Sequence, residues 1–380
     1  MLLPLIGVAL RPALGLRGML LGALLGLMPL MLIAVCGVHE VGHVIGGLLS
    51  RFRFAGLFVG PLSIARDGTR LRMQPNSSWS LVGGMAICVP PPGSIRDSRS
   101  ALAFLAGGPL ASVLFGAALL ALHFAFGLDE VTRRTIDAGR HTVPEFLIGA
   151  TTFIGGVCSL LVTVVTLIPN RVGGFTSDGA ALRMLWQRGA DANSWLTTMA
   201  LMGDAFDGVR PRNWPEERVA LIAAIDPSSP MASGCHAMAL LAAFDRSDRD
   251  AVRHHLAQLQ AALHKAPAVA QASVRLDEAW HALGEGRVAD ARTAYDAGAS
   301  GFVEQYVRCR VHAGVLHAEG HVERAREEAR EGLRRLDEAP KPYPGLVIFE
   351  REMLVALAEG RKVPTVWPDS PAARSAIGTT

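Results

Sequence analysis

Three long stretches of the chain carry no charged side chain. They are Met19–Val38, Leu102–Leu128 and Phe146–Asn170, and His123 is the only titratable group in the second. Each has about the 20 residues that a helix needs to cross the hydrocarbon core of a bilayer. A buried helix of a water-soluble protein rarely runs so far without a charge. The pattern therefore predicts three transmembrane helices.

The first stretch has an alternative interpretation as a cleaved signal peptide, because Arg11 and Arg17 precede it and Cys36 lies near its end. Val35 fits poorly before a lipoprotein-type cleavage at Cys36. The apolar run also continues into His39–Leu49 without a small-residue processing site. We therefore expect an uncleaved, multi-pass membrane protein.

The flanking charges predict an orientation. The loop Arg51–Ser100 holds seven arginines against two aspartates, whereas the connection between the second and third stretches mixes both signs. By the positive-inside rule this loop is cytoplasmic, the N-terminus is outside, and everything after the third stretch is cytoplasmic. The excess of arginine over lysine and the modest length favour a bacterial plasma membrane.

The loop between the first two stretches favours strands. Phe52–Met73 alternates apolar and polar residues in places and contains several Gly and Pro, which is typical of short strands and turns. Val82–Met85 contains the pair Gly83 and Gly84. The predicted fold is mainly α, with a polytopic helical membrane core that carries a small β-containing loop and precedes a soluble α-helical repeat domain.

After Trp186 the composition changes to Ala, Arg, Glu and Leu at helical spacing. A weak repeat appears there with an offset of 34 residues, which is the tetratricopeptide period. A non-repeating helical bundle is the alternative. The eight matching pairs are Val269/Val303, Gln271/Gln305, Ala279/Ala313, Glu285/Glu319, Gly286/Gly320, Val288/Val322, Ala291/Ala325 and Arg292/Arg326.

These observations predict four segments: a membrane core over residues 1–185, a helical linker over 186–230, a cytoplasmic tetratricopeptide-like domain over 231–363 and a disordered tail over 364–380. Half of the 380 residues are hydrophobic and the net charge is only +3, which argues against a nucleic-acid binder. The five cysteines form no CxxC pair, so we expect isolated thiols instead of a disulfide framework.

The strongest chemical motif is His-Glu-Val-Gly-His at residues 39–43. Residues four apart share one face of a helix, so His39 and His43 can reach one metal ion, with Glu40 beside them to take a proton from water. Glu40 is the only acid among the first fifty residues and follows an apolar run. Ionisable groups at membrane depth are expensive and indicate function.

Two histidines leave a third ligand to be found. Asp178 follows the third apolar stretch, and the predicted topology puts it at the same depth as His39 and His43. Its alternative role is the N-cap of a helix over Gly179–Trp186. The spacing by itself leaves both roles open.

Three sequence blocks resemble the site-2 protease family of intramembrane zinc metalloproteases. They are His39–His43, the Gly-Gly-Pro-Leu-Ala-Ser block at Gly107–Ser112, and Ile168–Asn170 followed by Ser177–Gly179. Their order and the intervening apolar spans also match, over residues 19–185. The resemblance implies Zn²⁺ held by His39, His43 and Asp178.

The chain departs from the family in the last two blocks. Ser112 and Thr166 stand where the family often has Asn, and the gap from Pro169 to Asp178 is longer than usual. Asn170 is a candidate to replace the missing amide at the substrate. Family members also often hold the substrate as an added strand on a Gly-rich loop, which implies a substrate-binding role for Gly83 and Gly84. Ordinary loop packing is the alternative.

The expected activity is hydrolysis of peptide bonds in or near transmembrane segments of membrane-protein substrates, with water activated by zinc and Glu40. The expected partners are such a substrate, the lipid bilayer and a protein docked on the helical repeats, with no nucleic acid. One alternative is an inactive membrane-anchored helical-repeat scaffold. A metal transporter is another, although such proteins spread polar groups over several spans.

Overall fold

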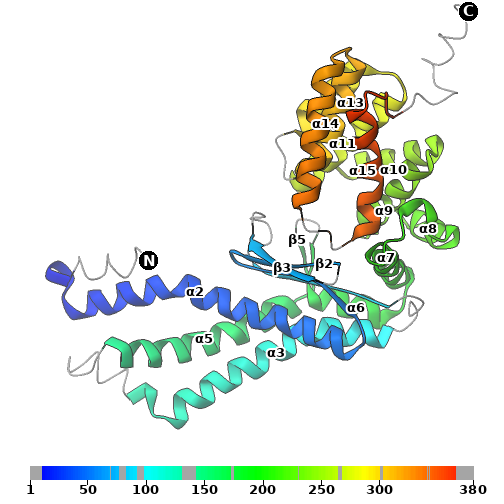
Figure 1. The fold of residues 1–380 in the computed structure, drawn as a ribbon. Coiled ribbons are helices and arrows are strands. Elements are labelled where there is room, and N and C mark those ends of the chain that lie inside the picture. Colours follow the sequence, from blue (N-terminus) through cyan, green and yellow to red (C-terminus); the bar gives the residue numbers. More distant parts are fainter. Residues whose placement is uncertain are drawn as a thin grey trace, which may run out of the picture.

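Three long apolar helices pack side by side at one end of the molecule, where their outer ends project away from the remaining elements (Figure 1). Among the described residues, three stretches are long and apolar enough to cross a membrane: Leu21–Leu49, Ser98–Ala125 and Phe146–Leu167. These stretches match the three that the uncharged runs predict. The computed structural model describes residues 11–68, 70–76, 83–91, 98–130, 143–172, 175–229, 231–263, 268–299, 303–339, 341 and 343–364. The long helices are α2 (Arg11–Leu49), α3 (Ser98–Ala125) and α5 (Val143–Leu167).

Large apolar side chains cover the outside of these helices. A soluble protein rarely exposes a contiguous apolar surface of this kind, whereas a lipid-facing helix must. The exposed apolar side chains therefore favour a bilayer around α2, α3 and α5. They include Leu21, Leu25, Leu30, Ile45, Leu49, Leu110, Leu114, Phe124, Ile148, Leu161 and Val165.

Helices α2 and α3 approach each other closely because glycines face one another at the crossing. A Cβ atom added to Gly42 would lie 2.4 Å from the Gly107 carbonyl oxygen, and one added to Gly46 would lie 2.5 Å from the Ala103 oxygen. No side chain fits into these gaps. Small residues let backbones touch in membrane helix pairs, and this contact presses the His-Glu-Val-Gly-His segment of α2 against α3.

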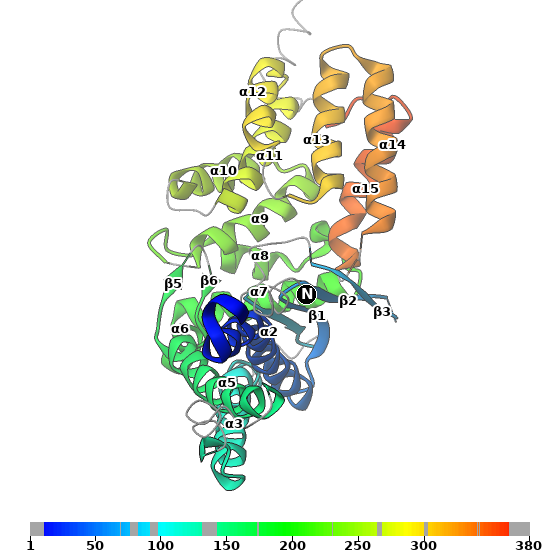
Figure 2. The ribbon, with the colours of Figure 1, turned by 90° about the vertical axis from the view of Figure 1, so that its left-hand side faces the viewer.

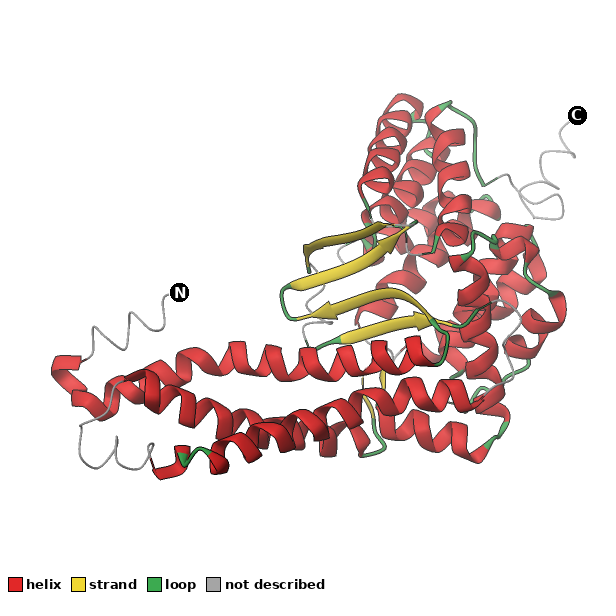
Figure 3. Ribbon diagram, turned by 60° about the horizontal axis from the view of Figure 1, so that its bottom comes forward, coloured by secondary structure: helices red, strands yellow, loops and turns green. Residues whose placement is uncertain are grey.

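A four-stranded antiparallel sheet fills the connection from α2 to α3, in the order β3-β2-β1-β4. Gly60 takes a positive φ of 51° in the turn between β1 and β2, where Val59 pairs with Leu62. The sheet lies between the long helices and the C-terminal helices (Figure 3). Its edges are β3 and β4. The strands are β1 (Arg53–Val59), β2 (Leu62–Asp67), β3 (Arg70–Pro75) and β4 (Met85–Val89).

Short elements follow α5 and lead to the C-terminal helices. A two-stranded hairpin precedes α6, and α7 packs against β4 on one side and against the C-terminal helices on the other. The predicted linker, residues 186–230, therefore forms packed helices. The elements are β5 (Arg171–Val172), β6 (Phe175–Thr176), α6 (Asp178–Gln187), α7 (Ala190–Phe206), the 3-10 helix η2 (Pro211–Asn213) and α8 (Glu216–Ala223).

The described C-terminal part consists of the consecutive helix pairs α9/α10, α11/α12 and α13/α14, followed by α15 (Figure 2). Two of these pairs have the 34-residue offset. Gly286 and Gly320 both take positive φ where one helix ends and the next begins, and Ala279 and Ala313 are both fully buried. The helices are α9 (Ala232–Arg246), α10 (Arg249–Ala262), α11 (Ala268–Gly284), α12 (Val288–Gly298), α13 (Gln305–Ala318), α14 (Val322–Glu338) and α15 (Pro344–Ala358).

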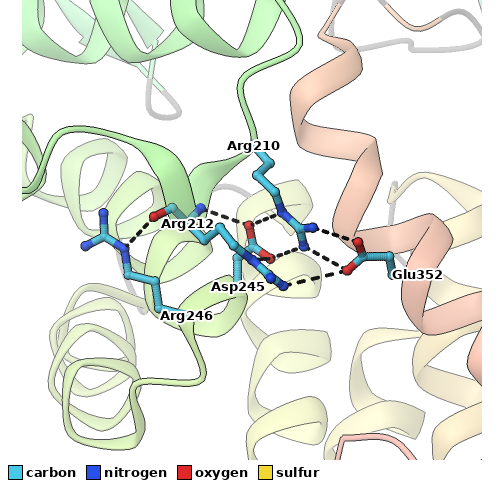
Figure 4. Close-up of polar contacts among 5 residues, drawn as sticks. All are labelled: Arg210, Arg212, Asp245, Arg246 and Glu352. Carbon is cyan, nitrogen blue, oxygen red and sulfur yellow. Dashed lines mark hydrogen bonds and ion pairs between the residues drawn. The ribbon is translucent and has the colours of Figure 1, made fainter.

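An ion-pair network centred on the buried carboxylate of Asp245 joins three separate segments of the helical part (Figure 4). Asp245 near the end of α9 accepts hydrogen bonds from the Arg210 guanidinium and from the Arg212 backbone and side chain. Arg210 also donates to Glu352 on α15. The network therefore fixes the chain before η2 against both α9 and α15. The predicted disordered tail lies outside the described residues from position 365 onward.

Candidate metal centre

The two histidines of α2 point to the same place between α2, α3 and α6. They lie one helical turn apart, so their rings stack edge to face with centroids 4.9 Å apart. The Nε2 atoms of His39 and His43 are 3.2 Å apart. Both side chains are buried, although they belong to a helix whose outer surface is apolar.

Asp178, at the start of α6, completes the group. Its Oδ2 atom is 3.0 Å from His39 Nε2, and its Oδ1 atom is 3.3 Å from His43 Nε2. The N-cap of α6 is Ser177, whose side chain accepts a hydrogen bond from the Ala180 N–H. The alternative N-cap role therefore does not apply to Asp178, and its carboxylate is directed at the two imidazoles.

Gly179 makes this approach possible. A Cβ atom added there would lie 1.9 Å from the carbonyl oxygen of Leu167, the last residue of α5. Only glycine can follow Asp178 at this contact. The Asp-Gly pair in the sequence thus brings the start of α6 against the end of α5.

Burial raises the pKa of Asp178, but hydrogen bonds to His39 and His43 outweigh burial and hold the pKa at about 2. The carboxylate is therefore ionised at neutral pH, which is the form that binds a cation.

The donor atoms have the spacing of a tetrahedral zinc site. Bonds of about 2.0–2.1 Å at tetrahedral angles place ligand atoms about 3.3 Å apart. The two Nε2 atoms are 3.2 Å apart, and each lies 3.0 or 3.3 Å from a different oxygen of the Asp178 carboxylate. Two imidazole nitrogens and one carboxylate oxygen are also a donor set that suits Zn²⁺ and leaves a fourth position open. These residues therefore fit a zinc ion.

Each imidazole is oriented by a hydrogen bond on its far side. His43 Nδ1 donates to the Phe104 carbonyl oxygen at 2.9 Å, and His39 Nδ1 lies 2.9 Å from Ser112 Oγ. Both partners belong to α3. Such bonds fix which nitrogen carries the proton and leave Nε2 free to bind a metal.

The Gly107–Ser112 block serves this arrangement in two further ways. A Cβ atom added to Gly108 would lie 2.3 Å from His43 Nε2, so glycine makes room for the ring. Ser159 on α5 donates a hydrogen bond to the backbone oxygen of Ser112 at 2.8 Å. The role of Ser112 as the partner of His39 could not be predicted from the sequence, where it only marked a departure from a family pattern.

Glu40 lies beside the three candidate metal ligands and against the start of β4. A Cβ atom added to Gly84 would lie 2.7 Å from Glu40 Oε1, and the main chain of Ala86 is within hydrogen-bonding reach of the carboxyl group. Gly84 also has a positive φ of 119°, which favours glycine. The sheet therefore borders the acid directly.

A cavity of about 880 Å³ opens over these groups. Gly83 and Gly84 line it, whereas Asn170 lies at a different hollow, where its backbone N–H donates to Ser177 Oγ. Asn170 therefore does not line the cavity beside Glu40. Sequence reasoning missed several other lining residues, because nothing in the local sequence indicates that they meet here. They are Cys36, Phe104, Cys158, Thr166, Trp195, Met231 and Gly234.

No protein-family model matches the chain, and comparisons with curated proteins and with solved structures gave no significant match.

Proposed function

We propose that this chain is an intramembrane zinc metalloprotease of the site-2 protease type. The observation that carries the proposal is the convergence of His39, His43 and Asp178 beside Glu40, at the cavity where three membrane-length helices end. His39, His43 and Asp178 would hold the ion. When bound, Zn²⁺ supplies Lewis-acid activation of water and of the scissile carbonyl group.

The residues of the chain have separate tasks. The Glu40 carboxylate accepts the proton of the attacking water and then delivers it to the leaving amine, which is general base and general acid work by one group. Ser112 and the Phe104 carbonyl keep the two imidazoles in a single orientation. Gly84 leaves the space that the Glu40 carboxylate occupies.

The sheet offers a way to hold the substrate. A transmembrane helix satisfies its carbonyl groups internally, so a peptide bond must leave the helix before it can be attacked. Strand β4 is an edge of the sheet, and Met85 and Ala86 on it line the cavity with Gly83 and Gly84. An unwound segment of a membrane-protein substrate can pair with β4 as an added strand, which replaces the lost hydrogen bonds.

The helical region would be a soluble, cytoplasmic, tetratricopeptide-like docking domain. Its support is the shared environment of two glutamates that lie 34 residues apart. Glu285 and Glu319 each form a bidentate ion pair with an arginine of the preceding helix pair, Arg249 on α10 and Arg292 on α12 respectively. Stacked helix pairs create extended surfaces that bind a protein partner or a substrate tail.

Replacing Glu40 by Gln tests the function and separates it from the inactive scaffold. In detergent or reconstituted vesicles, with an apolar helical substrate, Glu40→Gln should cut the cleavage rate by about 10²–10⁴-fold, as expected for loss of a general base. Zinc content, measured by elemental analysis, should not change. Glu323→Gln, at an exposed position on α14, is the matched control and should cleave normally.

Two outcomes would contradict the proposal. Undiminished cleavage by Glu40→Gln would remove the assigned acid from the mechanism. No cleavage by a wild-type chain that binds zinc, across a panel of helical substrates, would favour the scaffold.

A further inference from the structure

Three histidines converge on one helix pair of the C-terminal region. His236 belongs to α9, and His254 and His255 belong to α10. One ring nitrogen from each lies within 4.8 Å of those of the other two, and the Nδ1 atoms of His236 and His255 are 3.2 Å apart. That separation equals the one between the two ring nitrogens of the candidate metal centre.

The burial of these rings leaves one nitrogen unexplained. His236 and His255 are 3% and 5% exposed, and His236 Nε2 is buried without a hydrogen-bond partner in the described part of the chain. Buried polar atoms are rarely left unpaired. This Nε2 atom is not the nitrogen of the 3.2 Å contact, which is Nδ1, so it gains a partner only if it is the atom through which His236 binds the ion.

We propose that His236, His254 and His255 form a second metal site, which binds a divalent cation of the Zn²⁺ type and clamps α9 to α10. Imidazole nitrogens suit zinc and its neighbours, and three of them can hold an ion that completes its coordination with water. Water can reach the site because His254 is exposed. A shared proton between His236 and His255, without a metal, is the competing account of the 3.2 Å contact.

The proposed histidine site would also affect the cavity beside Glu40, a consequence that rests on the proposed function. Met231 and Gly234 line that cavity, and they open the helix that carries His236. An ion that joins α9 to α10 therefore stiffens one wall of the cavity from outside the membrane-length helices. Occupancy by zinc would reduce the motion of this wall.

The experiment counts zinc ions in the full-length chain with the first site disabled. Asp178→Ala removes the carboxylate from the candidate metal centre, and the purified variant is stripped with a chelator and titrated with Zn²⁺ alone. We expect about one ion per chain from the histidine site. Adding His254→Gln, at an exposed position that tolerates substitution, should abolish that ion, whereas adding His321→Gln, also exposed, should not.

Hydrogen exchange gives a second measurement that does not depend on activity. Zinc should slow backbone exchange over residues 231–236 in the Asp178→Ala chain but not in the Asp178→Ala/His254→Gln chain. Equal zinc binding by both chains, or none by Asp178→Ala, would overturn the second site. Neither result would bear on the Glu40→Gln cleavage assay, so failure here is distinguishable from failure of the proposed function.

Discussion

Ser112 is the residue whose role depends most on the three-dimensional structure. Its hydroxyl is fully buried and lies 2.9 Å from His39 Nδ1, so it sets the orientation of that ring. Outer partners of metal-binding histidines typically account for 10–100-fold in metal affinity. In the family that the chain resembles, Asn is common at this place, and both side chains can hydrogen-bond an imidazole nitrogen.

The first residue-scale prediction is that Ser112→Ala weakens zinc binding by about 10–100-fold. The imidazole of His39 loses the hydrogen bond that fixes its direction. Competition titration against a chromophoric chelator measures the change. Ser159→Ala is the matched control, since it deletes another buried hydroxyl that touches only the Ser112 backbone and the α3–α5 contact. Equal affinities for the two variants would exclude the orienting role.

The second residue-scale prediction concerns Gly108. The added methyl group of Gly108→Ala would lie 2.3 Å from His43 Nε2, so the ring must leave its place. We expect zinc binding to be lost while the chain still folds, because overpacking of this size typically costs about 1–3 kcal/mol. Gly83→Ala, which meets nothing within 4 Å although Gly83 lines the same cavity, should bind zinc normally. Normal zinc uptake by Gly108→Ala would contradict the assigned position of His43.

At the scale of elements, Asp245 ties α9 to the segment before η2 (Figure 4). Burial raises its pKa, but hydrogen bonds from Arg210 and Arg212 outweigh burial and leave the pKa below its usual value. A depressed pKa means that the carboxylate stabilises the fold above the unfolded pKa of about 3.9 and loses that contribution as pH falls through the folded value.

Asp245→Asn should therefore destabilise the helical region at pH 7, and by progressively less as pH falls below the unfolded pKa of about 3.9. Removing one partner of a buried ion pair typically costs about 3–5 kcal/mol. Thermal unfolding of the full chain in detergent, followed by circular dichroism at pH 7 and at a series of pH values below the unfolded pKa, measures the difference. Asp250→Asn, at a side chain that is 89% exposed, should unfold like the wild type at all of these pH values. A pH-independent gap between Asp245→Asn and wild type would refute the assignment.

Some elements could be predicted from the sequence because their signal is local. The length of the three uncharged stretches predicted α2, α3 and α5. The four-residue spacing of His39 and His43 predicted that both side chains share one helix face. The position of Asp178 after the third apolar stretch made it a candidate ligand but left its role open, and only the resemblance favoured the ligand role, since 139 residues separate it from His39. The positions of Phe104, Trp195 and Met231 at the cavity could not be predicted. Close helix packing and the folding of α9 onto the cavity leave no periodic pattern in the sequence.

At the scale of the whole molecule, contacts between the sheet and the C-terminal helices indicate that these two parts lie on the same side of a membrane. Arg53 of β1 pairs with Asp207 after α7, and Arg72 of β3 donates to the Glu338 carbonyl oxygen at the end of α14. These contacts require the sheet and the C-terminal helices to share one face. The C-terminal end of α3 and the start of α5 lie at the opposite ends of the long helices from the sheet, since α3 runs back from the sheet before α5 returns (Figure 1).

Cysteine labelling in intact cells tests this arrangement. In a chain whose five cysteines are replaced by alanine, Arg70→Cys and Glu323→Cys should resist a membrane-impermeant maleimide added outside, whereas Asp129→Cys should react. The positive-inside rule predicts that the arginine-rich loop Arg51–Ser100 is cytoplasmic. Because the sheet in this loop contacts the C-terminal helices, we expect those helices on the same side. All three positions should react after detergent lysis. Reaction of Glu323→Cys from outside, together with protection of Arg70→Cys, would be incompatible with the packing of β3 against α14.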